Sequence, residues 1–88
     1  MNNVNESSFL PNLPHSPGVY LMRDGIGTII YIGKAIDLKK RVASYFMESK
    51  KADTRLQALV TSIRHVDYVA TASEREALVL ERKLIGEH

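Results

Sequence analysis

Residues 18–33 read Gly-Val-Tyr-Leu-Met-Arg-Asp-Gly-Ile-Gly-Thr-Ile-Ile-Tyr-Ile-Gly, two apolar runs on either side of a glycine-containing segment. β-Branched and aromatic residues that flank such a segment are typical of a β-hairpin. We expect a register that is symmetric about the turn and places Tyr20 opposite Tyr31, with both phenols on one face because side chains alternate along a strand. Such a pair can simply stabilise the sheet or, with Lys34 at the strand exit, form a polar cluster that transfers protons.

The composition is that of one small soluble domain, with 88 residues of which 44% are hydrophobic and 25% charged. Cysteine is absent, which excludes disulfides, thiolate catalysis and cysteine-based metal sites and is compatible with a reducing compartment. No apolar run approaches the roughly 20 residues of a membrane span, and the N-terminus lacks the basic-then-apolar pattern of a secretory signal. We therefore expect a cytoplasmic protein that makes no membrane contact.

Positive charge is concentrated in the middle of the chain. From Lys34 to Arg64 there are eight basic and three acidic residues, whereas the net charge of the whole chain is only +2. A basic surface on a nearly neutral domain favours contact with phosphate groups. The alternative is that these side chains form ordinary solvated helix faces. The candidates for a nucleic-acid contact are Lys34, Lys39, Lys40 and Arg41.

The remaining periodicities complete an α+β domain. They predict, in chain order, a helix at 37–48 with Asp37 as its N-cap, a helix at 54–64 capped by Asp53, a β-rich strand at 66–71, and a helix at 73–85 opened by a capping box of Ser73 and Glu76. Residues 1–12 are polar and without clear periodicity, so we expect a flexible lead-in before a single domain at 13–88. The order β-β-α-α-β-α predicts a small three-stranded antiparallel sheet flanked by helices.

Two features of the expected helices point to chemistry. Arg41 and Tyr45 are four residues apart and therefore share a helix face. Glu81 interrupts the apolar stripe of the last helix, where a carboxylate is destabilised by desolvation unless a cation or hydrogen-bond donors meet it. One Mg²⁺ held by this carboxylate, waters and a substrate phosphate fits that position. The alternative is a Glu81 that pairs with Arg41 or accepts a hydrogen bond from a tyrosine.

Several motifs occur in the order and spacing of a known family. They are Gly18-Val19-Tyr20, Tyr31-Ile32-Gly33-Lys34-Ala35, Asp37-Leu38-Lys39-Lys40-Arg41-Val42, Ser44-Tyr45-Phe46 and Glu74-Arg75-Glu76-Ala77-Leu78-Val79-Leu80-Glu81. From about Leu13 to Ile85 the chain resembles the GIY-YIG nucleases, and among them the UvrC branch of bacterial nucleotide excision repair. The resemblance implies the GIY-YIG fold and a metal-dependent endonuclease that cuts damaged double-stranded DNA on the 3′ side of the lesion, with UvrB and UvrA as partners.

The resemblance also implies roles for individual residues. Those that carry over are Tyr20, Tyr31, Lys34, Arg41, Tyr45 and Glu81 as catalytic residues, and Gly18 and Gly33 as residues that shape the site. Glu81 would bind one divalent ion, Mg²⁺ or Mn²⁺, and Arg41 would hold a phosphate oxygen. One of the two hairpin tyrosines would take a proton from the attacking water, with positive charge supplied by Lys34, and Tyr45 would line the site. Gly33 would let the backbone approach the ion or the phosphate.

The chain departs from the family toward its C-terminal end. Lys83 stands where the family often has asparagine, and the family's later Pro-Arg-Tyr-Asn segment has no counterpart up to His88. Either the sequence is a fragment of a longer chain, with the family's asparagine beyond residue 88, or the site lacks one polar member. Two alternative functions also stay open. One is a non-catalytic nucleic-acid-binding module that uses the same basic surface. The other is a GIY-YIG nuclease outside repair, although such enzymes usually carry an additional specificity domain.

Overall fold

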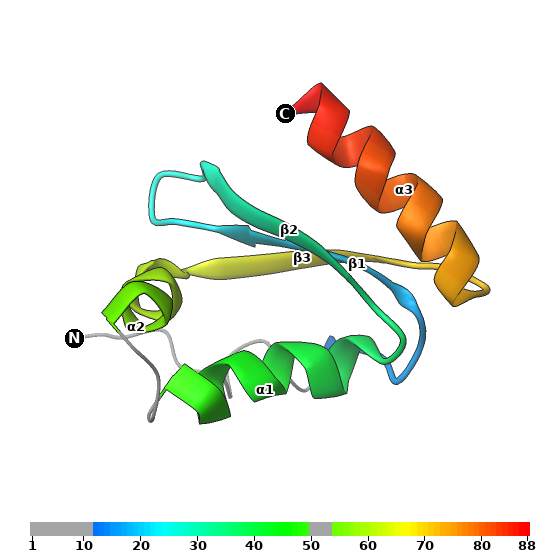
Figure 1. Cartoon of the computed structure of the whole chain (residues 1–88). Coiled ribbons are helices and arrows are strands. Elements are labelled where there is room, and N and C mark those ends of the chain that lie inside the picture. Colours follow the sequence, from blue (N-terminus) through cyan, green and yellow to red (C-terminus); the bar gives the residue numbers. More distant parts are fainter. Residues whose placement is uncertain (1–11, 50–53) are drawn as a thin grey trace.

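The computed structural model describes residues 12–49 and 54–88 and has the element order β-β-α-α-β-α (Figure 1). The elements are β1 (Gly18–Arg23), β2 (Ile29–Ala35), α1 (Leu38–Ser49), α2 (Thr54–Ser62), β3 (His65–Ala70) and α3 (Glu74–Glu87). This order confirms the expected α+β class, and the helices begin and end within two residues of the predicted positions. Residues 1–11 of the expected lead-in, Lys50 and Lys51 of the basic segment and the expected N-cap Asp53 lie outside the described residues. Within the described ranges, no helix is long and apolar enough to cross a membrane.

The three strands form an antiparallel sheet with the order β2-β1-β3, so β1 is central and β2 is an edge strand. Helices α1 and α2 lie on one face of the sheet, and α3 crosses the other face (Figure 1). Each face has its own apolar cluster. The α1 side is built around Tyr20, Met22, Leu38, Val42 and Ile63, and the α3 side around Val19, Leu21 and Ala77. Residues 18–22 of β1 are buried on both faces, which agrees with their continuous apolar sequence.

The hairpin register differs from the symmetric one that the sequence suggested. Tyr20 is opposite Gly33, and Tyr31 is opposite Met22. The register shifts at the hairpin end of β1, where β2 contains one additional residue, Ile30. This β-bulge breaks the strict alternation, so that Ile30 packs on the α1-side cluster while Tyr31 stacks on Tyr20. The predicted direct pairing of the two tyrosines is therefore wrong, yet they are diagonal neighbours on one face.

Two predicted helix caps are confirmed. Oδ1 of Asp37 accepts a hydrogen bond from the backbone N–H of Lys40 at 2.9 Å. Oγ of Ser73 accepts one from the N–H of Glu76 at 3.2 Å, and the Glu76 carboxylate accepts one from the N–H of Ala72 at 3.0 Å. Caps of this kind satisfy N–H groups that have no partner within the helix. They fix where α1 and α3 begin, and therefore which of their side chains lie beside the edge strand β2.

Candidate active site

Three tyrosines from three different elements meet on the α1 face of the sheet. Tyr20 belongs to β1, Tyr31 to β2 and Tyr45 to α1. The hydroxyls of Tyr20 and Tyr45 are hydrogen-bonded at 3.0 Å. The ring centroids are 5.9–6.0 Å apart in all three pairs, with Tyr20 and Tyr31 stacked and Tyr45 edge-on to both. Tyr20 is 1% exposed and Tyr31 is 38% exposed, so this tyrosine cluster extends from the core to the surface.

The two glycines expected to shape the site make room for close packing. A Cβ atom on Gly33 would lie 2.5 Å from Cζ of Tyr20 and 2.9 Å from Cε2 of Tyr31, so a side chain there would displace both rings. A Cβ atom on Gly18 would meet the backbone of β3 and the side chain of Leu38. The sequence suggested that Gly33 brings the backbone close to an ion or a phosphate. In the structure, the space beside it is filled by the ring of Tyr20.

Arg41 brings a permanent positive charge to the tyrosine cluster. Its Cζ atom lies 5.5 Å from the ring centroid of Tyr45, one turn further along α1, which is within cation–π range. The shared face expected from their spacing is therefore present. A hydrogen bond with Tyr20 raises the pKa of Arg41, and the residue is exposed. Such a guanidinium is held in place by the rings and remains free to bind an anion.

The pKa values of all three phenols lie above the ordinary value of 10.0. Burial is the main cause for Tyr20 and for Tyr45, whereas for Tyr31 the main cause is its hydrogen bond with Tyr45. The charge of Arg41 acts in the opposite direction and lowers the pKa of each phenol. The net effect is that the tyrosine cluster is protonated at neutral pH, and a phenolate requires more positive charge than Arg41 alone provides.

Glu81 has no partner of its own in the part of the chain that the structure describes. Helix α3 packs Ala77, Leu80 and Leu84 on the sheet, and Glu81 is half-buried beside that apolar row. The Glu81 side chain therefore lies at the side of this apolar row and not between the row and the sheet. No charged side chain among the described residues is fully buried. Its charge contributes to the raised pKa of Tyr31, which places the carboxylate within electrostatic reach of that phenol. No cation or hydrogen-bond donor of the described residues meets the carboxylate, neither Arg41 nor a tyrosine.

Lys34 does not face the tyrosine cluster. It is opposite Val19 in the hairpin, and Val19 belongs to the apolar cluster on the α3 side. Alternation along β2 therefore sends Lys34 to the face opposite that of Tyr31. Nζ of Lys34 lies 3.6 Å from Oε2 of Glu74 in the first turn of α3. The expectation that Lys34 supplies the charge beside the phenols is thus wrong for this structure, because the cation that lowers the phenol pKa values is Arg41.

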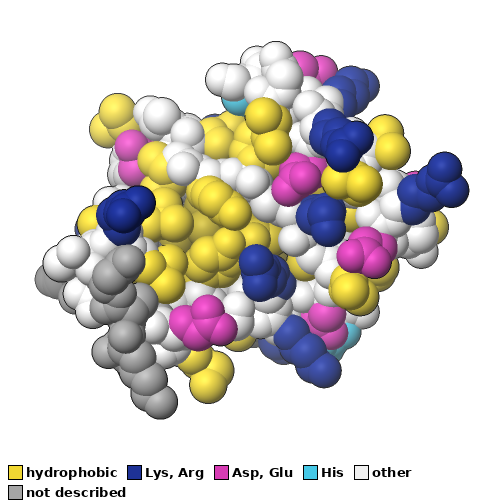
Figure 2. Space-filling model, viewed as in Figure 1, with side chains coloured by type: hydrophobic (Ala, Val, Ile, Leu, Met, Phe, Trp, Pro, Cys, Tyr) yellow, Lys and Arg dark blue, Asp and Glu magenta, His cyan; other side chains and the backbone are white. Residues whose placement is uncertain are grey.

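A shallow depression connects these charges around the end of β2. It is lined by Lys34, Ala35, Ile36, Asp37, Lys40, Arg41, Ser44, Glu48 and Glu74. Three of the four candidates for a nucleic-acid contact line it, whereas Lys39 does not and instead donates its backbone N–H to the carbonyl of Pro14 at 3.2 Å. Figure 2 shows lysine and arginine side chains around a hydrophobic area on this side of the molecule, with acidic side chains between them. The lining thus contains three cations and three carboxylates, so an anion such as a phosphate would be bound by individual cations and not by a net positive charge of the depression.

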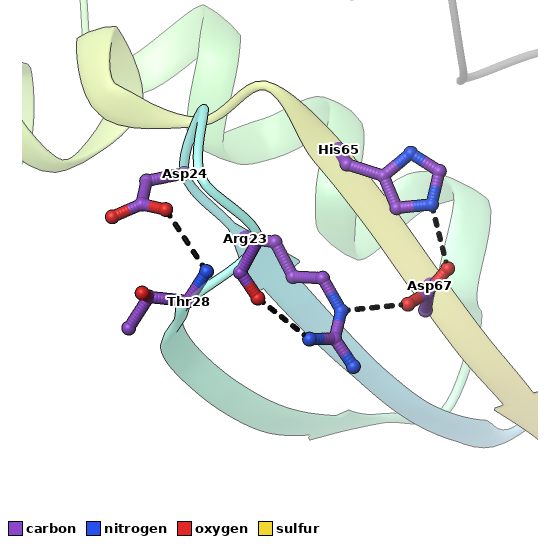
Figure 3. Close-up of polar contacts among 6 residues, drawn as sticks. Arg23, Asp24, Thr28, His65 and Asp67 are labelled. Atoms are coloured by element: carbon purple, nitrogen blue, oxygen red, sulfur yellow. Dashed lines mark hydrogen bonds and ion pairs between the residues drawn. The ribbon is translucent and has the colours of Figure 1, made fainter.

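A second polar cluster, which we call the hairpin cluster, lies at the hairpin end of the sheet (Figure 3). Nε of Arg23 donates to Oδ2 of Asp67 at 2.9 Å, and Nη1 of Arg23 donates to the carbonyl of Gly27 at 2.8 Å. Nε2 of His65 and Oδ1 of Asp67 are hydrogen-bonded at 2.8 Å. Sequence reasoning missed this cluster because Arg23 and Asp67 are far apart along the chain. The polar alternation of His65 and Asp67 in β3 was the one available signal.

Comparisons with known proteins agree with this fold. The profile described as the UvrC-like GIY-YIG domain matches residues 16–88. The chain is 51% identical over 88 residues to the UvrABC system protein C of Haemophilus ducreyi, and 49% identical over 79 residues to that of Clostridium botulinum. These alignments cover 100% and 90% of this chain. The chain itself spans only 14% of the length of the first relative and 13% of the length of the second.

Solved structures give the same result. The GIY-YIG N-terminal endonuclease domain of UvrC from Thermotoga maritima, bound to magnesium as its catalytic divalent cation, is 29% identical to the chain. It matches the chain with a TM-score of 0.78 over 96% of this chain and 92% of that one. A tyrosine-to-phenylalanine mutant of the same domain, also bound to its catalytic divalent cation, matches with a TM-score of 0.76. The strand order, the helices and the hairpin motif define a GIY-YIG domain. The chain belongs to the UvrC-like GIY-YIG domain family.

Proposed function

We propose that this domain is a divalent-metal-dependent endonuclease that hydrolyses a phosphodiester bond of double-stranded DNA. One observation carries the proposal: three phenols and the exposed guanidinium of Arg41 lie together, and the carboxylate of Glu81, which has no partner among the described residues, is within electrostatic reach of Tyr31. The Thermotoga maritima domain, described as an endonuclease domain with a catalytic divalent cation, supports the same type of reaction here. Gly33 and Gly18 contribute by allowing the close packing on which this arrangement depends.

The residues present fit one Mg²⁺ or Mn²⁺ that keeps most of its water ligands. Mg²⁺ prefers oxygen ligands and is usually held by one or two carboxylates together with waters and substrate phosphate. Glu81 offers such a carboxylate, and no cation of residues 12–49 or 54–88 is paired with it. The part of the chain that the structure describes holds no group of three His, Cys, Asp or Glu side chains that could form an all-protein metal site. When bound, the ion would polarise the scissile phosphate and stabilise the leaving 3′-oxygen.

Arg41 is the residue that we propose for binding the scissile phosphate. A guanidinium can donate two parallel hydrogen bonds to a phosphate, and it offsets negative charge that develops during hydrolysis. The packing of Arg41 over Tyr45 limits the orientations that it must give up on binding. Lys34 and Lys40 line the same depression and would contact the same phosphate or its neighbours. Lys39 would contribute only to the general positive potential of this surface.

Tyr31 is our candidate for the general base. It is 38% exposed whereas Tyr20 is 1% exposed, so an attacking water can reach the phenol of Tyr31 more readily. Tyr20 would instead act as a positioning residue, since its hydroxyl is hydrogen-bonded to that of Tyr45. Because the pKa of Tyr31 is raised, its phenolate is scarce at neutral pH, and the nearby Arg41 charge favours the phenolate.

The biological setting that we propose follows from the relatives. They are C components of UvrABC systems, of which this chain spans 14% or less. We infer that the substrate is damaged double-stranded DNA, that the cut lies on the 3′ side of the lesion, and that UvrB and UvrA are the partner proteins. We further propose that the domain acts in the cytoplasm, where these partners would meet the chromosome.

A nicking assay run beside a DNA-binding assay tests the proposal. It uses the complete gene product with UvrA, UvrB and a duplex that carries one bulky lesion. We expect cutting that requires Mg²⁺ or Mn²⁺, stops on chelation, and returns when the metal is restored. We also expect duplex binding without sequence preference that weakens steeply as salt rises. Binding without cutting would favour the non-catalytic binding module, and cutting of undamaged DNA at one sequence would favour a nuclease outside repair.

A further inference from the structure

The ion pair between Lys34 and Glu74 has no role in the reaction as proposed above. Its Nζ–Oε2 distance is 3.6 Å, and the two side chains are 36% and 54% exposed. Exposed pairs with this geometry contribute little to the stability of a domain. The position of Glu74 in the first turn of α3 is also favourable for the helix dipole, but the dipole does not explain why this carboxylate lies beside Lys34.

Lys34 begins on the side of the sheet that faces away from the tyrosine cluster. Its position opposite Val19 sends it toward α3, and its long flexible stem would otherwise sample many rotamers. Glu74 lies in the first turn of α3 and restricts that sampling. Both residues line the depression that Arg41 lines from α1. The pair therefore holds the ammonium at the α3 side of the depression, across from the guanidinium.

We propose that Glu74 is a positioning residue, which holds Lys34 opposite Arg41 so that one DNA phosphate binds between two cations from opposite faces of the sheet. This inference rests on the proposed function. The distance of 3.6 Å is longer than the 2.7–3.2 Å of an N–H···O hydrogen bond. An ammonium group has three N–H donors, so Lys34 keeps donors for a phosphate oxygen while the carboxylate restricts its position. Glu74 itself makes no contact with the phosphate in this arrangement.

Glu76 provides a matched control in the same helical turn. Both glutamates place a negative charge at the N-terminus of α3, where it interacts favourably with the helix dipole. The Glu76 carboxylate, however, accepts a hydrogen bond from Ala72 and does not line the depression. Glutamine can still accept that bond. If the loss of charge at the start of α3 is what slows cutting, Glu74→Gln and Glu76→Gln should both be slower. If the positioning of Lys34 is what matters, only Glu74→Gln should be slower.

The test compares Glu74→Gln, Glu76→Gln, Lys34→Met and the double variant Lys34→Met/Glu74→Gln in the nicking and binding assays described above. We expect Glu74→Gln to bind duplex at least as tightly as the wild type, because a negative charge beside the phosphate is lost, yet to cut about tenfold more slowly at saturating DNA. Glu76→Gln should cut at the wild-type rate. In the Lys34→Met background, Glu74→Gln should have no further effect on cutting, because no ammonium remains to be positioned.

Three results would overturn the inference while leaving the proposed function intact. They are wild-type cutting by Glu74→Gln, an equal loss in Glu76→Gln, and losses that multiply in the double variant. Glu74→Asp keeps the charge and should recover part of the lost rate, which a purely structural role of the longer side chain does not predict. If the wild type fails to cut with metal present, the proposed function is wrong and this inference is wrong with it.

Discussion

Two polar clusters share strand β1, and they differ in how completely the protein satisfies them. In the hairpin cluster, Arg23, Asp67 and His65 are bonded to one another and to the backbone of the turn (Figure 3). Beside the tyrosine cluster, the half-buried carboxylate of Glu81 has no partner among the described residues, and the guanidinium of Arg41 is exposed. A cluster that is closed on itself serves the fold. A half-buried carboxylate without a partner among the described residues, near an exposed guanidinium, points to a ligand.

The pKa shifts differ in direction between the two clusters, because only the hairpin cluster provides enough hydrogen-bond partners for its charged group. At Asp67, burial acts to raise the pKa, but the hydrogen bonds from Arg23 and His65 outweigh it and the net pKa is below the ordinary 3.8. The protein thus supplies the hydrogen-bond partners that Asp67 needs, among them the guanidinium of Arg23. In the tyrosine cluster the net pKa values are raised, as at Tyr31. Positive charge from outside the described residues would be required before a phenolate becomes abundant there.

The largest effect is expected from Glu81→Ala. Cutting should fall to background at any practical Mg²⁺ concentration, because the proposed metal ligand is lost. Thermal stability without metal should stay equal or rise slightly, since alanine favours helix and the carboxylate has no partner to strand. Any metal-induced rise in melting temperature should disappear, while DNA binding should persist or tighten. Nicking assays and melting curves with and without Mg²⁺ measure these effects.

The opposite pattern would show that Glu81, like the residues of the hairpin cluster, serves the fold. Loss of one partner from a buried ion pair costs about 3–5 kcal/mol. A variant that melts far lower than the wild type, yet still cuts DNA under conditions where it is folded, would mean that Glu81 serves the fold and that the metal has another ligand.

The next effect concerns the phenols. Tyr31→Phe should lower the cutting rate by about 10² or more, the usual contribution of a positioned general base, and leave the hairpin intact because the ring still packs. Tyr20→Phe should have a smaller effect, since it removes the hydrogen bonds of a buried hydroxyl with Tyr45 and Arg41 and not the proposed general base. Tyr68, which is 41% exposed on β3, provides the matched control, and Tyr68→Phe should cut like the wild type. Wild-type rates in both Tyr31→Phe and Tyr20→Phe, measured in the complete gene product with its partners, would remove the phenols from the mechanism.

A smaller effect is expected from pH. Because the pKa of Tyr31 lies above 10.0, the phenolate fraction rises about tenfold per pH unit below that value. The rate of the chemical step should therefore rise with pH between about 7 and 9. Single-turnover rates measured across this range should lose the rise in Tyr31→Phe. A rise that is unchanged in that variant would assign the proton transfer to another group.

The smallest effect is expected in the hairpin cluster. Asp67→Asn should lower the free energy of unfolding by at most about 1 kcal/mol, because its side chain is 44% exposed and such pairs are weak. The folded-state pKa of Asp67 is lowered, so its contribution is present above about pH 4 and is lost as the pH falls through the folded-state value. The stability deficit of Asp67→Asn should accordingly shrink in acid. Cutting should be unchanged at neutral pH, and a loss of cutting there would contradict the distinction between the two clusters.

Local sequence signals predicted much of this fold. The hairpin, the caps at Asp37 and Ser73 and the shared face of Arg41 and Tyr45 each depend on residues that are close along the chain, so spacing and turn chemistry are sufficient to predict them. The apolar stripe of α3 likewise identified Glu81 as an unusual position. These are the features for which intrinsic propensity and packing agree.

Other features depend on geometry that the spacing of residues does not contain. The bulge at Ile30 shifts the hairpin register, so symmetry about the turn could not predict that Tyr20 is opposite Gly33. Lys34 follows the site glycine directly, yet alternation turns it to the opposite face. The hairpin cluster joins strands that are distant along the chain. Motif reasoning identified the residues of the candidate site better than it identified their directions.

Paramagnetic broadening of backbone amide NMR signals by Mn²⁺ tests most directly whether Glu81, beside the tyrosine cluster, is part of a metal site. The broadening detects weak binding of the ion and shows which residues lie near it. The carboxylate of Asp67 in the hairpin cluster serves as an internal control. We expect broadening centred on Glu81 and Tyr31 in the wild type, little effect around Asp67, and loss of the broadening in Glu81→Gln. The same broadening in Glu81→Gln, or a maximum at the hairpin cluster, would contradict the account.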